Sequence, residues 1–179
     1  MMRRLTHMLA RLRRGEDGNA SIEFVILFPV FIAVFASAFE AGLVAMRHSM
    51  LDRALDLAVR DLRLGDPDLR THDDLKDAVC NYAGIIPECD ESLHLELERI
   101  SKENWSFRTG QVQCIDRDED ITPAVNFTPG TSNDMMLITA CAVFSPMVPI
   151  SGLGLKLPRV NGGEHYALIS MSAYVNEPS

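Results

Sequence analysis

The chain has 179 residues, of which 17 are Lys or Arg and 25 are Asp or Glu, for a net charge of −8 at pH 7. Five of the 17 bases but only two of the 25 acids lie in residues 1–18, so the remaining chain carries 12 bases against 23 acids, a net charge of −11. An acidic body offers no electrostatic footprint for a phosphate backbone, which argues against nucleic-acid binding. The basic leader, residues 1–18, points instead to a membrane.

Residues 19–46 are predicted to form a transmembrane helix. Between Phe24 and Met46 the only charged residue is Glu40. At about 1.5 Å per residue this stretch is roughly 34 Å long, enough to cross a hydrocarbon core of about 30 Å. The Arg-rich leader predicts a cytoplasmic amino terminus and places the rest of the chain across the membrane, which in a bacterial inner membrane means the periplasm. Pro29 is expected to kink the helix because it removes an internal hydrogen bond.

A cleaved secretory signal is the alternative interpretation of this segment. The basic region and apolar core are followed by Ala36-Ser37-Ala38, which is typical of a signal-peptidase site. Apolar residues resume at positions 41 and 43–46, so the apolar stretch is longer than the roughly 7 to 15 residues of a usual signal core. The length favours an uncut helix.

Residues 47–64 are predicted to continue the helix with an amphipathic pattern. Apolar residues recur every three to four positions, with charged residues between them: Met50, Leu51, Ala54, Leu55, Ala58, Val59 and Leu62. Leu64-Gly65-Asp66-Pro67 is expected to end the helix. The apolar stripe must then pack against a globular domain.

Residues 65–179 are predicted to form that domain, with an α+β fold. Thr71-His72-Asp73-Asp74 has the outline of a capping box and predicts one short helix over 72–83. Alternating or continuous apolar runs predict three to four mostly antiparallel strands, at 93–98, 111–115, 135–144 and 166–175. We expect the first to be half-exposed and the run at 135–144 to be a central strand covered on both faces.

Four cysteines lie beyond the apolar segment, an even number that fits disulfides in an oxidising periplasm. Four cysteines allow three pairings, and sequence cannot prove one. We favour Cys80 with Cys89, closing a short loop at a helix end, and Cys114 with Cys141, joining two strands. A thiol-disulfide enzyme would need Cys-x-x-Cys, which is absent.

No catalytic, cofactor-binding or metal-binding residue is predicted. The five histidines are scattered and form no zinc motif. The acidic run at 116–120 resembles the opening of a calcium loop, but Ile121 occupies the required Gly position and Phe127 the position of the bidentate acid. Hydrolase and phosphate-loop motifs are absent as well. We therefore predict a protein that is not an enzyme and needs no cofactor.

The boundary between leader and helix carries a family resemblance. Gly18 is followed by Asn19-Ala20-Ser21-Ile22-Glu23-Phe24, with Glu23 the fifth residue after the glycine. This resembles the prepilin-peptidase site of type IV pilin-like proteins. Together with Pro29 and Phe39-Glu40-Ala41-Gly42, residues 15–60 resemble the TadE and TadF pseudopilins of the tight-adherence (type IVb) pilus. Arg47 departs from the family pattern, in which a polar residue often lies closer to the glycine.

The resemblance implies roles for several residues. The peptidase would cut after Gly18 and leave Asn19 as the first residue. Glu23 would then pair with the freed amino group of Asn19 in its own or a neighbouring subunit and register the subunits, although an acid there could simply cap the helix start. Glu40 is expected to make a helix-helix contact with another protein or to reach the membrane interface.

The implied partners are the inner membrane, prepilin peptidase, other pilins or pseudopilins, and the pilus-assembly platform proteins. The alternative hypothesis is an uncut single-pass anchor that presents an acidic periplasmic domain to a partner.

Overall fold

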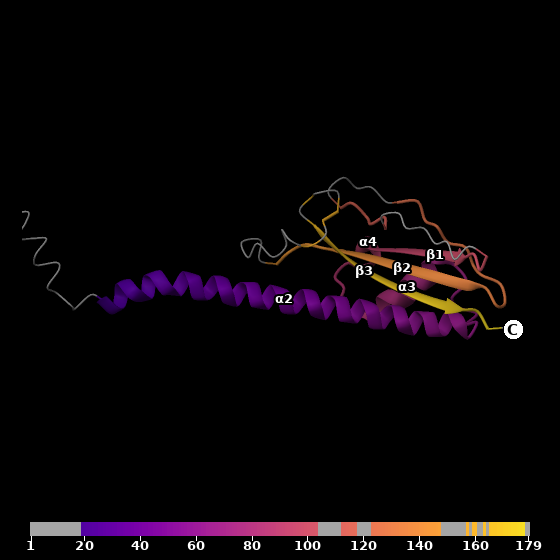
Figure 1. The fold of residues 1–179 in the computed structure, drawn as a ribbon, viewed down its shortest axis with the longest axis horizontal. Helices are drawn as coiled ribbons and strands as arrows, with labels where there is room; N and C mark the ends of the chain where they lie inside the picture. The colour runs from indigo at the N-terminus through magenta and orange to yellow at the C-terminus, as the bar shows by residue number, and fades with distance from the viewer. Residues whose placement is uncertain are drawn as a thin grey trace, which may run out of the picture.

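The computed structural model describes residues 19–103, 112–117, 123–147, 157, 159–160, 163 and 165–177. A long helix, α2 (Asn19–Arg63), precedes the short helices α3 (His72–Ala83) and α4 (Cys89–Ser92). Three strands follow, β1 (Leu93–Ile100), β2 (Met135–Phe144) and β3 (Tyr166–Val175), as Figure 1 shows. The predicted α+β class is confirmed. The leader, residues 1–18, lies outside the described residues.

Helix α2 is a single rod of 45 residues that continues through Pro29. Its second half buries the predicted stripe, since Leu51, Ala54 and Leu55 are completely buried. Arg60 and Arg63 lie in the last turn, where cations suit the negative end of the helix dipole. The helix ends at Arg63, and the turn that follows contains Gly65, whose φ of 73° is the left-handed conformation in which glycine closes a helix without steric cost.

Helix α3 begins and ends at the predicted residues. The Asp74 backbone N–H donates to Thr71 Oγ1 at 3.2 Å, and the Thr71 N–H donates to Asp74 Oδ2 at 3.0 Å, which completes the capping box. Gly84 ends the helix in the left-handed conformation. One face of α3 is buried, through Leu75 and Val79.

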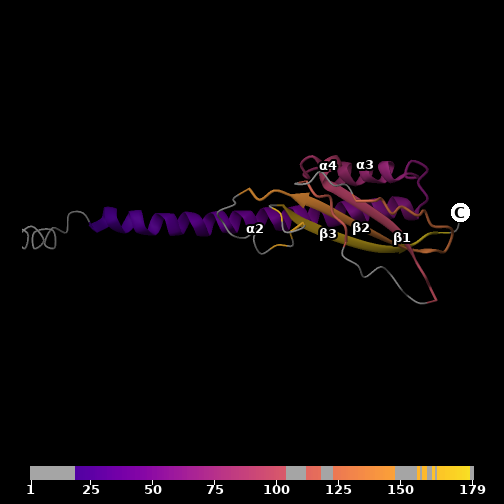
Figure 2. The same cartoon turned by 90° about the horizontal axis from the view of Figure 1, so that it is seen from above.

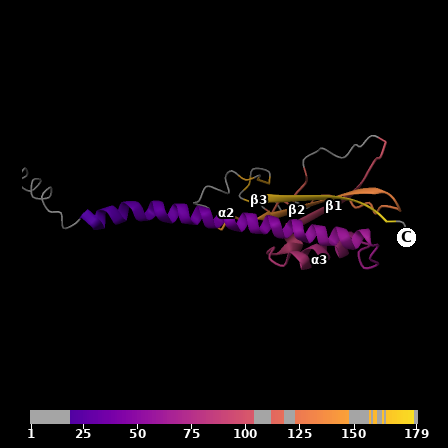
Figure 3. The same cartoon turned by 60° about the horizontal axis from the view of Figure 1, so that its bottom comes forward.

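The three strands form one antiparallel sheet in the order β1-β2-β3. Helices α2 and α3 lie on the same side of it (Figure 3), and between them and the sheet is the main core. A smaller apolar cluster covers the opposite face, built on Cys141, Val143 and Ala167. The central strand β2 is therefore buried on both faces over residues 138–144, as predicted. The first half of α2 extends away from the sheet (Figure 2).

Two expectations about the strands are wrong. Residues 112–115 form no strand; instead Val112 and Cys114 pack against the second face of the sheet. Strand β1 is also less exposed than its alternation predicts, because His94 is only 3% exposed. His94 is paired in register with Cys141, and its side chain lies on the face of the sheet that residues 112–115 help to cover. Helix α4, a single turn, was not predicted.

Candidate functional site: the exposed helix and its junction with the domain

The first half of α2 presents an apolar surface on all sides. Its large apolar side chains from Ile22 to Phe39 are between 43% and 68% exposed. A soluble monomer rarely exposes a continuous apolar surface of this extent. The stretch within Ser21–Arg63 is long and apolar enough to cross a membrane, with a mean hydropathy of 2.4 over its most apolar 18 residues. These properties fit a single-pass membrane protein (Figure 1).

The residues of the predicted processing and registration site lie at the start of this helix. Asn19 opens α2 and Gly18 lies outside the described residues. Glu23 is exposed one turn into the helix, next to Phe24, whose ring stacks on that of Phe28 at 4.9 Å. Cleavage after Gly18 and pairing of Glu23 with a neighbouring amino terminus stay predictions.

Glu40 lies where the exposed half of α2 meets the domain. Its side chain is 1% exposed, and its Oε1 accepts a hydrogen bond at 3.1 Å from the Met147 backbone N–H, just after β2. A carboxylate is costly to bury unless hydrogen bonds compensate it. The structure therefore turns Glu40 toward its own domain, a contact across 107 residues that no local sequence signal reveals. The predicted helix-helix contact stays a prediction.

Two turns further on, Arg47 joins α2 to the sheet. Its Nη1 donates a 2.7 Å hydrogen bond to the Tyr166 hydroxyl, and its guanidinium carbon lies 4.9 Å from the centroid of the Phe144 ring. The rings of Phe144 and Tyr166 stack at 5.7 Å. Burial raises the pKa of the Tyr166 phenol, and the adjacent Arg47 cation opposes that rise. Sequence reasoning noticed Arg47 only as a departure from the family pattern and missed Tyr166.

Further contacts hold α2 to the domain along its second half. The His48 ring Nε2 lies 3.2 Å from the Ile169 carbonyl oxygen on β3. At the far end, Arg63 Nε donates to Glu177 Oε1 at 3.0 Å. Exposed ion pairs of this kind contribute only about 0 to 1 kcal/mol each. The buried apolar stripe therefore supplies most of the attachment, and the polar contacts fix its position.

Two disulfides join the pairs favoured from the sequence. Cys80–Cys89 links the last turn of α3 to the start of α4, and Cys114–Cys141 ties the loop before β2 to the centre of that strand. The second bond therefore joins a loop to a strand, because residues 112–115 form no strand. Such bonds persist in oxidising compartments.

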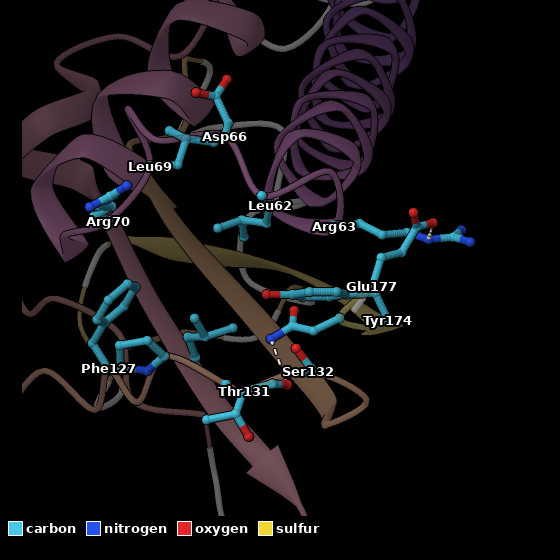
Figure 4. A pocket seen from close by; sticks show the side chains of 15 residues that line it. Leu62, Arg63, Asp66, Leu69, Arg70, Phe127, Thr131, Ser132, Tyr174 and Glu177 are labelled. Atoms are coloured by element: carbon cyan, nitrogen blue, oxygen red, sulfur yellow. Dashed lines mark hydrogen bonds and ion pairs between the residues drawn. The ribbon is translucent and has the colours of Figure 1, made fainter. Parts of the chain in front are cut away.

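A cavity of about 620 Å³ lies where α2 ends, at the opposite end of the helix from Glu23 (Figure 4). Leu62, Phe127 and Tyr174 contribute to its walls, and Arg63 and Arg70 to its rim. Within the described ranges, no group of three or more His, Cys, Asp or Glu side chains is placed to hold a metal ion.

Residues 18–60 match the family model described as TadE-like protein. This match supports the interpretation of the chain as a TadE-like protein. The TadE-like segment comprises the whole exposed half of α2 and most of its amphipathic half, and it overlaps residues 15–60, on which the resemblance was based. No curated protein and no solved structure matches the chain. The TadE-like family suggests involvement in assembly of the tight-adherence pilus with other pilus proteins.

Proposed function

We propose that this TadE-like chain is a pseudopilin-like subunit that takes part in assembly of a tight-adherence pilus after prepilin peptidase removes residues 1–18. Its cytoplasmic amino terminus would be followed by a single span of the bacterial inner membrane over residues 19–46. Residues 65–179 would form a periplasmic domain attached through the amphipathic half of the helix at 47–64. No catalytic step is assigned to the chain.

The observation that carries the proposal is the agreement between the family match and the exposed helix. The matched residues 18–60 contain every large apolar side chain between Ile22 and Phe39, and each of these side chains is left exposed by the part of the chain that the structure describes. The apolar side chains of such a helix can be covered by lipid and, once the helix leaves the membrane, by the helices of other subunits. The two disulfides support a periplasmic domain.

The proposal is tested at the mature amino terminus. The protein is purified from its native membrane with prepilin peptidase present, and its start is determined by intact mass and terminal peptide mapping. We expect a start at Asn19. A matched pair of variants sharpens the result: Gly18→Leu should leave the chain uncut, whereas Gly15→Leu, three residues earlier in the leader, should still be processed.

Other starting residues would support other functions. An intact Met1 in the unmodified chain would favour the uncut anchor, which presents its acidic domain to a partner and needs no cleavage. A start at Phe39 would indicate signal-peptidase cleavage after Ala38 and a secreted domain, which contradicts the membrane-anchored proposal.

A further inference from the structure

The segment that follows β2, residues 145–147, contacts α2 at the level of Glu40. The Met147 backbone N–H donates to Glu40 Oε1 at 3.1 Å, and the Glu40 side chain is 1% exposed. Figures 1 and 2 show the chain beyond β2, in orange, continuing past the sheet toward the exposed half of α2. The domain therefore extends along the helix beyond the end of its sheet.

The level of Glu40 within the proposed span can be counted along the helix. A hydrocarbon core about 30 Å thick takes up about 20 residues at about 1.5 Å each, so an upright helix that enters it at Phe24 leaves it close to Leu43. The proposed span ends slightly later, at Met46. By either count Glu40 lies roughly 5 to 9 Å inside the outer boundary, and a tilted helix would place it deeper.

Met147 lies at the same depth as the acid that it contacts. The Cα–Cβ bonds of a helix tilt toward its amino-terminal end, so the Glu40 carboxylate points toward the middle of the proposed span rather than away from it. The Met147 side chain, next to this carboxylate, is 60% exposed. An apolar side chain exposed at this depth would meet acyl chains.

The backbone of the segment suits contact with lipid. Pro146 has no N–H group, and the N–H of Met147 is bonded to Glu40, so neither residue presents an unpaired donor. The same bond compensates part of the cost of an acid inside an apolar stretch. Arg47, the next charged residue of α2, lies roughly 10 Å beyond Glu40, within the headgroup layer, where a cation suits lipid phosphates.

We propose that residues 145–147 form a second membrane contact of the domain, in which the Met147 side chain inserts among the acyl chains of the leaflet nearest the domain. The neighbouring surface of α2 selects lipid as the partner: Phe39, next to Glu40 in the helix, is 53% exposed, so the apolar surface of the proposed span continues to this level. The inference rests on the proposed span over residues 19–46 and adds a lipid contact outside α2.

The first test uses the unmodified full chain, with one chain in each lipid nanodisc so that no other subunit is present. Met147 and Met171 are a matched pair, because their side chains are 60% and 58% exposed. Met171 lies two residues beyond Ile169, whose carbonyl oxygen is at the His48 ring, and it is roughly 15 Å further from the proposed span. Chloramine-T, a charged oxidant that stays in water, is added, and peptide mass spectrometry follows sulfoxide formation. We expect Met147 to be oxidised about fivefold more slowly than Met171.

The second test identifies what covers Met147. All four native cysteines are in disulfides, so a single introduced cysteine can carry the fluorescent label NBD. Three labelled variants are placed in vesicles whose phospholipids carry a nitroxide quencher on an acyl chain: Met147→Cys, Met171→Cys and Phe31→Cys, the last within the proposed span. We expect the label at position 147 to be quenched about fivefold more strongly than the label at 171, because only the first lies at acyl-chain depth.

Equal oxidation of Met147 and Met171 would overturn the proposal. Protection of Met147 without quenching at position 147 would also overturn it, because protein rather than lipid would then cover this side chain. The label at Phe31 separates this inference from the proposed function. If that label is quenched and the label at 147 is not, the span is retained and the second contact is lost; if neither is quenched, both are lost.

Discussion

At the residue scale, three ionisable side chains are placed where their charge has consequences: Glu23, Glu40 and His94. Glu23 is exposed near the start of α2, Glu40 is buried at the junction, and His94 is buried in the sheet. An exposed acid within an apolar segment needs an external partner, whereas a buried group must be satisfied internally. Glu23 is therefore the candidate for contact between subunits.

Replacing Glu23 by Ala should reduce pilus-dependent surface attachment about tenfold or more. Loss of about 1.4 kcal/mol from a registration step makes it tenfold less populated, and breaking a buried charge pair costs more than that. The amount of protein in the membrane fraction should not change. Glu16→Ala, in the leader that the proposed processing would remove, is the matched control. Normal attachment by the Glu23 variant would refute the registration role.

His94 should make the domain less stable in acid. Burial lowers the pKa of its imidazole, an effect that nearby Glu96 opposes and that His72 and Lys76 reinforce. The unfolded chain therefore takes up this proton more readily than the folded chain, so stability is complete above about pH 6.5 and falls as the pH drops below it. We expect thermal unfolding midpoints to fall from pH 7 to pH 5, with a shallower fall for His94→Gln. Equal slopes would contradict this assignment.

At the element scale, α2 has two environments in one continuous helix. Its first half exposes apolar side chains all round, and its second half buries a single stripe against the sheet and α3. The family match crosses this boundary and ends at residue 60, inside the buried half. The helix thus combines a segment that is long and apolar enough to cross a membrane with a structural component of the domain core.

The buried stripe can be tested at Leu55, which is completely buried. Leu55→Ala should cost about 2 to 5 kcal/mol, the sum of lost burial and the cavity left behind. Hydrogen exchange of the β2 amides in the full chain measures this loss at the centre of the sheet. The control is Leu64→Ala, at a side chain that is 65% exposed just after the helix, and it should change stability by less than about 0.5 kcal/mol. Similar effects of both changes would show that the stripe does not support the sheet.

At the scale of the whole molecule, the contacts of Glu40 and Arg47 fix the domain on the helix near the proposed membrane boundary. Arg47 bonds the Tyr166 hydroxyl and lies over Phe144, and Glu40 accepts from the segment that follows β2. These links join the start of β3 and the end of β2 to one side of α2. They give the domain a defined orientation relative to the exposed half of α2.

A double-mutant cycle of Arg47→Gln and Tyr166→Phe should give a coupling energy of about 1 kcal/mol, because the two side chains share a charge-assisted hydrogen bond. Hydrogen exchange of the β3 amides measures the free energy of unfolding of the unmodified protein, the two single variants and the double variant. The control is a second cycle that combines Arg53→Gln, at an exposed position of α2, with Tyr166→Phe, and its coupling energy should be near zero. A coupling near zero for Arg47 would show that the bond adds nothing to the packing around it.

The sequence by itself determined the features that depend on neighbouring residues. The apolar run and its amphipathic continuation predicted α2, the capping box predicted the bounds of α3, and the continuous apolar run predicted that β2 is central. Local periodicity suffices in these cases because each pattern states which faces of the element must be buried.

The tertiary structure alone decided what depends on distant segments. Glu40 with Met147, Arg47 with Tyr166, and the cavity around Tyr174 join residues separated by more than 100 positions or drawn from several loops. Contacts with distant segments also explain the two wrong predictions about the strands. Residues 112–115 have a strand-like pattern, but they pack on the face of the sheet and are held there by the Cys114–Cys141 disulfide. His94 occupies a position that the alternating pattern predicts to be exposed, but other parts of the chain cover it. Burial by another part of the chain leaves no local periodic signal, so only the folded arrangement could show it.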